Sequence, residues 1–250
     1  MKKQKLSENE LILKKQKNKK IRETVLIWFI FLSFVGSIIF VTYKLIVTPS
    51  GAVNETGRGK SDYVLMILQC LLGIFSLLMS GFLSKKIRII IPSNMMIAFA
   101  IFLYCAIYLG EVRSFYYRVP HWDSCLHAFS AMMLGTLGFS IISLLNKSDR
   151  VPVNLSPAFV GLFTLCFAVT VGVVWEIYEF SGDLIFHTNM QKYISASGAA
   201  KVGQEALADT MKDLIIDFCG AFLVAVVGYI SQKTRKNYLE NFQLKKEKEQ

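Results

Sequence analysis

The chain alternates between long apolar runs and short polar segments that hold most of its charged residues. A run of about 18 or more apolar residues is long enough to cross a bilayer as a helix. Such runs cover approximately residues 24–46, 63–83, 88–109, 123–145, 157–180 and 210–231. The pattern therefore predicts an all-α fold, a polytopic transmembrane bundle of six helices within residues 23–231.

The distribution of basic residues predicts how this bundle is oriented. Residues 1–22 form a basic arm with nine Lys/Arg, and residues 232–250 form a second basic tail. With the N-terminus inside, the predicted inner segments carry 20 Lys/Arg and the outer segments carry 6. Cytoplasmic loops are enriched in Lys and Arg, so both termini are expected in the cytoplasm. The tail is expected to prolong the last helix and to fray.

Composition supports the membrane prediction and excludes a nucleic-acid partner. Hydrophobic residues make up 53% of the chain and charged residues 18%, whereas soluble domains have about 45–50% and about 25%. The formal net charge is +10, but the basic residues fall at the ends of apolar runs, where they set topology. We expect the lipid bilayer as partner, with anionic lipid heads at the basic termini, and no nucleic acid. The expected location is the cell (plasma) membrane.

Neither a cleaved signal peptide nor a disulfide framework is expected. The first apolar run is longer than the ~7–15 residues of a signal-peptide core, and no clear cleavage site follows it. The five cysteines form no close pair and are expected to be free, buried side chains; they are Cys70, Cys105, Cys125, Cys166 and Cys219.

Ionisable side chains inside the apolar runs are the candidate functional residues, because charge in a membrane segment is costly. They occur at one end of each of the last three runs, and they are Asp123, His127, Glu176, Glu179, Asp209, Asp213 and Asp217. Spacings of three and four place the members of each run on one helix face. In the predicted topology all three sets lie at the outer side, so the sequence predicts one outward-facing carboxylate/His cluster.

Crowded carboxylates repel one another unless some keep their protons or a cation lies among them. Oxygen ligands with one imidazole suit Mg, Mn, Ca or Zn. A divalent metal is therefore the cofactor to consider, with Asp123, His127, Glu176 and Asp213 as candidate ligands. A Glu or His acting as general base without a metal is the alternative.

Simpler structural roles account for only part of this cluster. Asp123 and Asp209 would cap the fourth and sixth helices, since Asp is a favoured N-cap. Capping leaves the deeper Asp213 and Asp217 unexplained. Negative charge is unfavourable at a helix C-terminus, where Glu176 and Glu179 are expected, so these two residues need a partner.

The order and spacing of the three motifs resemble those of YjdF-like and VanZ-like bacterial membrane proteins. The last motif continues after Asp217 to Gly220 and Ala221. VanZ-like proteins commonly have Lys at the position of Ser124, Gln at that of Glu179 and Asn at that of Asp217, so the extra carboxylates favour the YjdF-like side. The resemblance covers the second half of the chain. It implies a cell-envelope setting, with VanZ-like members linked to glycopeptide-antibiotic tolerance, more than a defined activity.

Three functions remain open at this stage. The favoured one is a non-catalytic cell-envelope or membrane factor. A metal-assisted membrane enzyme acting on a lipid or envelope substrate is the first alternative, although the sequence has no H-E-x-x-H, G-x-S-x-G or P-loop motif. A cation or small-solute transporter is the second, although transporter sites lie near the midplane of repeated halves, and here the charges are one-sided and no repeat is visible.

Overall fold

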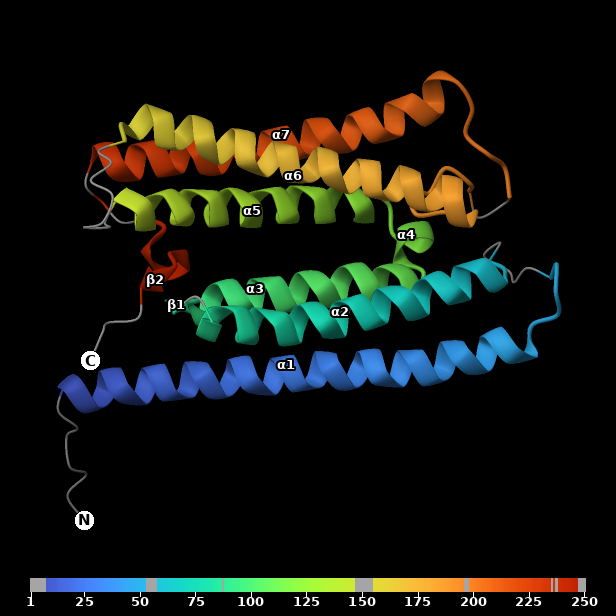
Figure 1. The fold of residues 1–250 in the computed structure, drawn as a ribbon, viewed down its shortest axis with the longest axis horizontal. Helices are drawn as coiled ribbons and strands as arrows, with labels where there is room; N and C mark the ends of the chain where they lie inside the picture. The colour runs from blue at the N-terminus through green and yellow to red at the C-terminus, as the bar shows by residue number, and fades with distance from the viewer. Residues whose placement is uncertain are drawn as a thin grey trace, which may run out of the picture.

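The structure is a computed structural model that describes residues 8–52, 58–86, 88–146, 155–195, 198–234, 236 and 238–246. Six helices in this part of the chain are long and apolar enough to cross a membrane, which confirms the predicted all-α membrane fold. All six run roughly parallel to the long axis of the molecule (Figure 1). They are α1 (Glu8–Val47), α2 (Lys60–Lys86), α3 (Ser93–Leu103) with its π-helical continuation η1 (Tyr104–Val112), α5 (Trp122–Asn146), α6 (Pro157–Phe186) and α7 (Gln204–Lys233).

Short elements connect and close the bundle. They are α4 (Phe115–Arg118) between η1 and α5, β1 (Ile89–Ile90) after α2, and η2 (Glu240–Phe242) and β2 (Lys245–Lys246) after α7. The strands pair antiparallel, with Ile89 opposite Lys246. Figure 1 shows that the start of α1 lies at the same end of the bundle as β2.

The tail does not prolong α7 as the sequence suggested. The Ser231 hydroxyl donates to the carbonyl of Lys236 and accepts the backbone N–H of Tyr238. These bonds turn the chain back on itself just after α7 ends. The backbone N–H of Leu244 then donates to the Ser140 hydroxyl of α5, which fastens the tail across the bundle.

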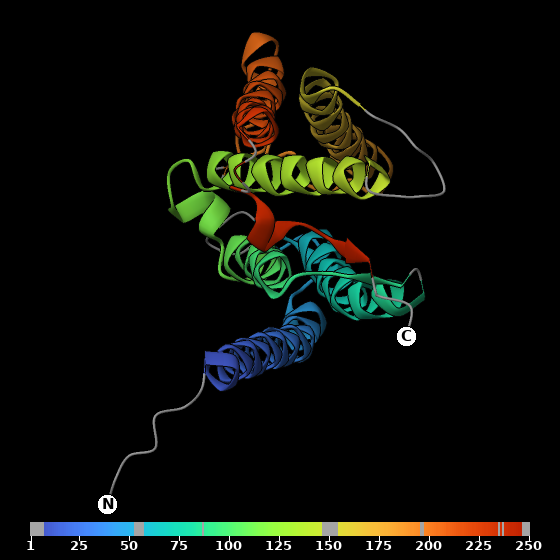
Figure 2. The ribbon, with the colours of Figure 1, turned by 90° about the vertical axis from the view of Figure 1, so that its left-hand side faces the viewer.

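The helices form two groups. In one group α5, α6 and α7 pack on one another, and in the other α1 packs on α2 and α3. Figure 2, viewed from the end that carries β2, shows α5 between the α6/α7 pair and the layer of α2 and α3, with α1 outermost. Contacts of α5 with α3 and η1 join the two groups.

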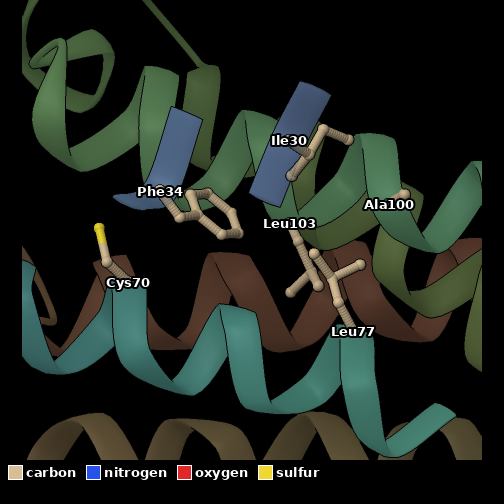
Figure 3. Packing of buried hydrophobic residues seen from close by; sticks show 6 residues of the cluster. All are labelled: Ile30, Phe34, Cys70, Leu77, Ala100 and Leu103. Carbon is tan, nitrogen blue, oxygen red and sulfur yellow. The ribbon is translucent and has the colours of Figure 1, made fainter. Parts of the chain in front are cut away.

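Tight side-chain packing holds α1, α2 and α3 together. Ile30 and Phe34 of α1 meet residues of α2 and α3 in the cluster of Figure 3. Lipid tails are as apolar as these side chains, so close van der Waals contact stabilises the association rather than escape from water. Cys70 is the one buried cysteine of the five, all of which are free. Cys125, Cys166 and Cys219 are exposed on their helices, contrary to the expectation of burial.

Glycine lets α5, α6 and α7 pack more closely. A Cβ on Gly220 of α7 would lie 3.0 Å from the carbonyl oxygen of Ala128 on α5. Small residues at such interfaces allow helix backbones to approach in membranes. This close approach brings polar side chains of α5, α6 and α7 within reach of one another.

Two of these helices extend beyond their apolar runs. α6 reaches Phe186 and α7 begins at Gln204, so only residues 187–203 connect them. Asp209 therefore lies inside α7 and does not cap it. Glu176 and Glu179 lie inside α6, so the unfavourable effect of a helix C-terminus does not apply to them. The capping position is taken by Gly203.

Candidate functional site

The last three helices bring their carboxylates to one buried histidine. His127 of α5 has its Nδ1 3.3 Å from Oδ1 of Asp217 on α7. Its Nε2 lies 3.6 Å from Oε1 of Glu176 on α6 and 3.9 Å from Oδ1 of Asp123, one turn earlier on α5. The imidazole therefore faces carboxylates from all three helices.

Asp213 completes this group. One ligand atom from each of Asp123, His127 and Asp213 lies within 4.8 Å of the other two. Asp213 is buried, whereas Asp123 keeps 39% of its side-chain surface exposed. We call the five residues Asp123, His127, Glu176, Asp213 and Asp217 the His127 cluster.

Two carboxylate oxygens of the His127 cluster are buried without a hydrogen-bond partner. They are Oε1 of Glu176 and Oδ1 of Asp213. The two residues are only 6% and 7% exposed. An isolated buried carboxylate is costly, so groups of this kind are paired, protonated or bound to a metal. The cluster thus has acceptors that require a cation or a proton.

The geometry around His127 suits a metal ligand. Asp217 is positioned to accept a hydrogen bond from Nδ1, which fixes the ring and leaves the Nε2 lone pair directed toward Glu176 and Asp123. A carboxylate behind a ligating histidine is a common arrangement in metal sites. Two ligands ~2.1 Å from one tetrahedral ion lie ~3.4 Å apart. The 3.6 Å between Nε2 and Glu176 Oε1 is close to that value.

A glycine on α6 fixes the position of Asp217. A Cβ on Gly172 would lie 3.1 Å from Cγ of Asp217 and closer still to its Oδ2. The absence of a side chain at residue 172 therefore makes room for the carboxylate between α5 and α6. Asp217 itself is 3% exposed.

Two of the seven residues indicated by the sequence lie apart from this cluster. Asp209 forms an ion pair of 2.7 Å with Lys201, and both side chains are partly exposed. Glu179 lies one turn nearer the end of α6 than Glu176, within electrostatic range of Lys192 as well as of Asp123 and Glu176. His121 and His187 lie in connections, with left-handed φ values of 59° and 53°. Neither histidine belongs to the group of potential metal ligands in the described residues.

A second polar network was not anticipated from the sequence. Glu111, in the last turn of η1, has its Oε1 2.6 Å from Nζ of Lys192 and its Oε2 3.5 Å from a guanidinium nitrogen of Arg58. The Arg58 guanidinium lies over the Tyr117 ring and the Lys192 ammonium over the Tyr116 ring, at 5.2 and 4.7 Å from the centroids. We call these five residues the Glu111 network.

The Glu111 network joins the two helix groups at the end of the bundle opposite β2. Arg58 precedes α2, Glu111 ends the third span, and Lys192 lies in the α6–α7 connection. A signal for it exists in the sequence, because Arg58 and Lys192 fall in predicted outer segments and Glu111 follows the third apolar run. The three lie in different loops and runs, however, and no local spacing relates them.

Two groups of this network that lie outside the spans, Lys192 and Tyr116, have perturbed pKa values. Burial lowers the pKa of Lys192, but the Glu111 carboxylate, together with Tyr117 and Glu179, more than offsets this effect and the net pKa is raised. Burial raises the pKa of the Tyr116 phenol well above its usual value, with a further contribution from the Asp123 and Glu111 carboxylates. Lys192 is therefore charged and Tyr116 neutral at physiological pH.

The connection between α6 and α7 is fastened at several points. Asp183, in the last turn of α6, accepts the backbone N–H groups of Met190 at 2.6 Å and Gln191 at 2.9 Å. The Gln191 amide donates to the Thr210 hydroxyl of α7 at 3.3 Å. These bonds hold Lys192 where it meets Glu111.

Comparison with known proteins places this arrangement in a family. The model of the family described as "Predicted membrane protein (DUF2238)" matches residues 52–234, which include all residues of the His127 cluster and of the Glu111 network. An uncharacterised protein of Thermotoga maritima is 29% identical over 139 residues, 55% of this chain. The chain spans 62% of the length of that relative. No solved structure matches the chain.

Proposed function

This chain belongs to the DUF2238 family of predicted membrane proteins. On that premise we propose that it is a non-catalytic membrane factor of the bacterial cell envelope. In this proposal the protein binds one divalent metal ion at the His127 cluster. The ion links α5, α6 and α7. The observation that carries the proposal is the buried Oε1 of Glu176, which has no hydrogen-bond partner and faces Nε2 of His127 at 3.6 Å. The resemblance to YjdF-like proteins agrees with the family match. We further propose that the protein is related to VanZ-like proteins.

The charge of the cluster favours a bound metal ion over a purely structural cluster of polar side chains. Four carboxylates surround a single imidazole, and removal of several negative charges from water is costly unless cations compensate them. A divalent ion supplies two positive charges at one point. It also gives a partner to both unpaired oxygens, on Glu176 and on Asp213.

The ligand types narrow the choice of metal. Asp123, His127, Glu176 and Asp213 provide three carboxylates and one imidazole. Ca²⁺ is bound by oxygen ligands, and Mg²⁺ usually keeps several waters. Zn²⁺ binds His and carboxylates in four-coordinate sites, and Mn²⁺ suits carboxylates. We therefore propose Zn²⁺ or Mn²⁺ as the bound ion.

Metal content tests this proposal directly. The detergent-purified protein, loaded with Zn²⁺ or Mn²⁺ and dialysed, is analysed by elemental mass spectrometry beside Asp213→Asn and Asp209→Asn. About one ion per chain is expected in the wild type and in Asp209→Asn, because Asp209 pairs with Lys201 instead. Asp213→Asn is expected to lose most of it. A wild type that retains neither metal, or an Asp213→Asn protein that retains as much as the wild type, overturns the proposal.

One observation favours a metal-assisted enzyme as second candidate. Asp123 keeps 39% of its side-chain surface exposed, so one side of the cluster is accessible. A metal held by the other ligands would make a bound water reached from that side a nucleophile at neutral pH, and in this second candidate Glu176 would act as its base rather than as a ligand. Turnover of an envelope phospholipid by the metal-loaded protein, lost in Glu176→Gln with the metal retained, supports catalysis. Absence of turnover favours the non-catalytic factor.

The proposal includes an orientation in the plasma membrane. Both basic ends lie in the cytoplasm near anionic lipid heads, and the His127 cluster faces outward. The charge distribution supports this orientation, as does the position of β2 at the same end of the bundle as the start of α1 (Figure 1). A fluorescent protein fused to the C-terminus is expected to fluoresce, whereas an alkaline phosphatase fused there is expected to be inactive. The reverse pair of results inverts the topology.

A further inference from the structure

A second candidate binding site lies on the other helix group. A cavity of about 450 Å³ opens between α1 on one side and the segment from η1 to α4 on the other. No residue of the His127 cluster lines it. A ligand bound in this cavity would therefore not contact the metal ion proposed above.

Two arginines line this cavity. Arg113 directly follows η1, where the third span ends, and Arg118 is the last residue of α4. Ser114 between them has a left-handed φ of 64° and turns the chain so that both arginines border the same cavity. Both are exposed. The cavity thus has a basic mouth at the end of a membrane span.

Neither arginine is neutralised by another residue in the described part of the chain. Their guanidinium groups make no ion pair or side-chain hydrogen bond there, whereas Arg58 and Lys192 both pair with Glu111. Guanidinium groups bind phosphate through paired N–H donors. Unpaired basic side chains at a bilayer surface attract anionic lipid.

The opposite wall of the cavity is a groove along α1. Ser33, Gly36, Ser37 and Phe40 share one face at helical spacing. A Cβ on Gly36 would have no heavy atom within 4 Å, so the groove is open at this point. The two serine hydroxyls donate to carbonyl oxygens four residues earlier, at 2.8 and 2.7 Å. Their donors are thus satisfied, and the wall accepts an apolar chain.

We propose that this cavity binds one anionic phospholipid of the surrounding bilayer. Its phosphate lies between Arg113 and Arg118, and one acyl chain follows α1 past Phe40 and Gly36 toward Ser33. That path is ~10 Å long at 1.5 Å per residue. A phospholipid matches both features of the cavity at once, because the basic mouth lies at the end of a span and the groove runs along the membrane helix.

Native mass spectrometry of the full chain tests this inference. The protein is released from nanodiscs that contain equal amounts of phosphatidylglycerol and phosphatidylcholine with the same acyl chains. Each basic side chain near a bilayer surface contributes about 1 kcal/mol toward anionic lipid. The wild type is therefore expected to retain phosphatidylglycerol over phosphatidylcholine by roughly tenfold or more.

Three variants separate the headgroup, the groove and general charge. The double variant Arg113→Gln/Arg118→Gln is expected to lose the preference for phosphatidylglycerol. Gly36→Leu fills the groove and is expected to lower retention of both lipids. Lys60→Gln removes a positive charge outside the cavity and is expected to behave as the wild type. Unchanged melting temperatures show that each variant is folded.

Some results overturn the inference. They are equal retention of the two lipids by the wild type, a preference that survives in the double arginine variant, or an equal loss in Lys60→Gln. Competition with inorganic phosphate distinguishes the source of the anion. Displacement of the retained lipid by millimolar phosphate would show that the groove contributes nothing, and would also overturn the inference.

Discussion

Oδ1 of Asp217 lies 3.3 Å from Nδ1 of His127, and the same carboxylate is packed against Gly172 of α6. One residue of α7 therefore depends on a histidine of α5 and on the lack of a side chain on α6. Asp217 is buried, and His127 is the partner that its carboxylate meets among the described residues.

The variant Asp217→Asn tests the role of this carboxylate behind the imidazole. The amide has nearly the same volume but no charge, so His127 becomes a weaker ligand. We expect the affinity for the proposed metal to fall by about 10–100-fold. Competition with a chelator measures this change, with Asp209→Asn as a control that keeps the wild-type affinity. An unchanged affinity in Asp217→Asn would separate Asp217 from the metal site.

The variant Gly172→Ala tests the close approach of α6 and α7. The added methyl group overlaps Asp217, and overpacking of this kind typically costs about 1–3 kcal/mol. The matched control is Gly81→Ala on α2, where a Cβ meets nothing within 4 Å. Thermal unfolding in detergent is expected to show a lower melting temperature for Gly172→Ala and an equal or higher one for Gly81→Ala. Equal shifts in the two variants would contradict the packing described here.

The variant Glu111→Gln tests the Glu111 network. It leaves the ammonium of Lys192, which is only 13% exposed, without its carboxylate, and loss of one partner of a buried pair typically costs about 3–5 kcal/mol. The control is Lys201→Gln, which breaks the more exposed pair with Asp209 and is expected to cost only about 0–1 kcal/mol. Denaturant titration compares the two. Similar losses would show that the Glu111 network contributes no more than a surface pair.

Alkaline pH is expected to destabilise the protein through the same network. The pKa of Lys192 and that of Tyr116 are both raised in the folded chain. Their contributions are fully present below the unfolded values of ~10.4 and ~10, and are lost as the pH rises through the folded values. Melting temperatures should therefore fall above about pH 10. A double variant Lys192→Gln/Tyr116→Phe is expected to flatten this fall, and an unchanged profile would refute the assignment.

Hydropathy was sufficient to predict the helices because each apolar run must form its hydrogen bonds within itself in a membrane. The ends of the helices were harder to predict. α6 continues beyond its apolar run to Phe186, and α7 begins several residues before its run, at Gln204. Polar residues such as Asp209 remain helical there, because a helix that leaves the bilayer no longer needs apolar side chains.

Helical spacing and topology placed the candidate residues at one level, but they did not determine which of them meet. Asp213 and Asp217 face His127, whereas Asp209, one turn earlier on the same stripe, pairs with Lys201. The difference depends on where Gly172 and Gly220 allow helices to approach. Such distances between helices are tertiary properties, and no periodicity within one run contains them.

The turn of the tail after α7 has a consequence for the order of events during synthesis. β2 is formed by the last residues that the structure describes, and its partner β1 follows α2. A nascent chain folds from its N-terminal side as it emerges, so β1 must wait until all later helices have been inserted. The contact between β1 and β2 can therefore form only after α7 has been synthesised, and it joins a strand made early in translation to one made after α7.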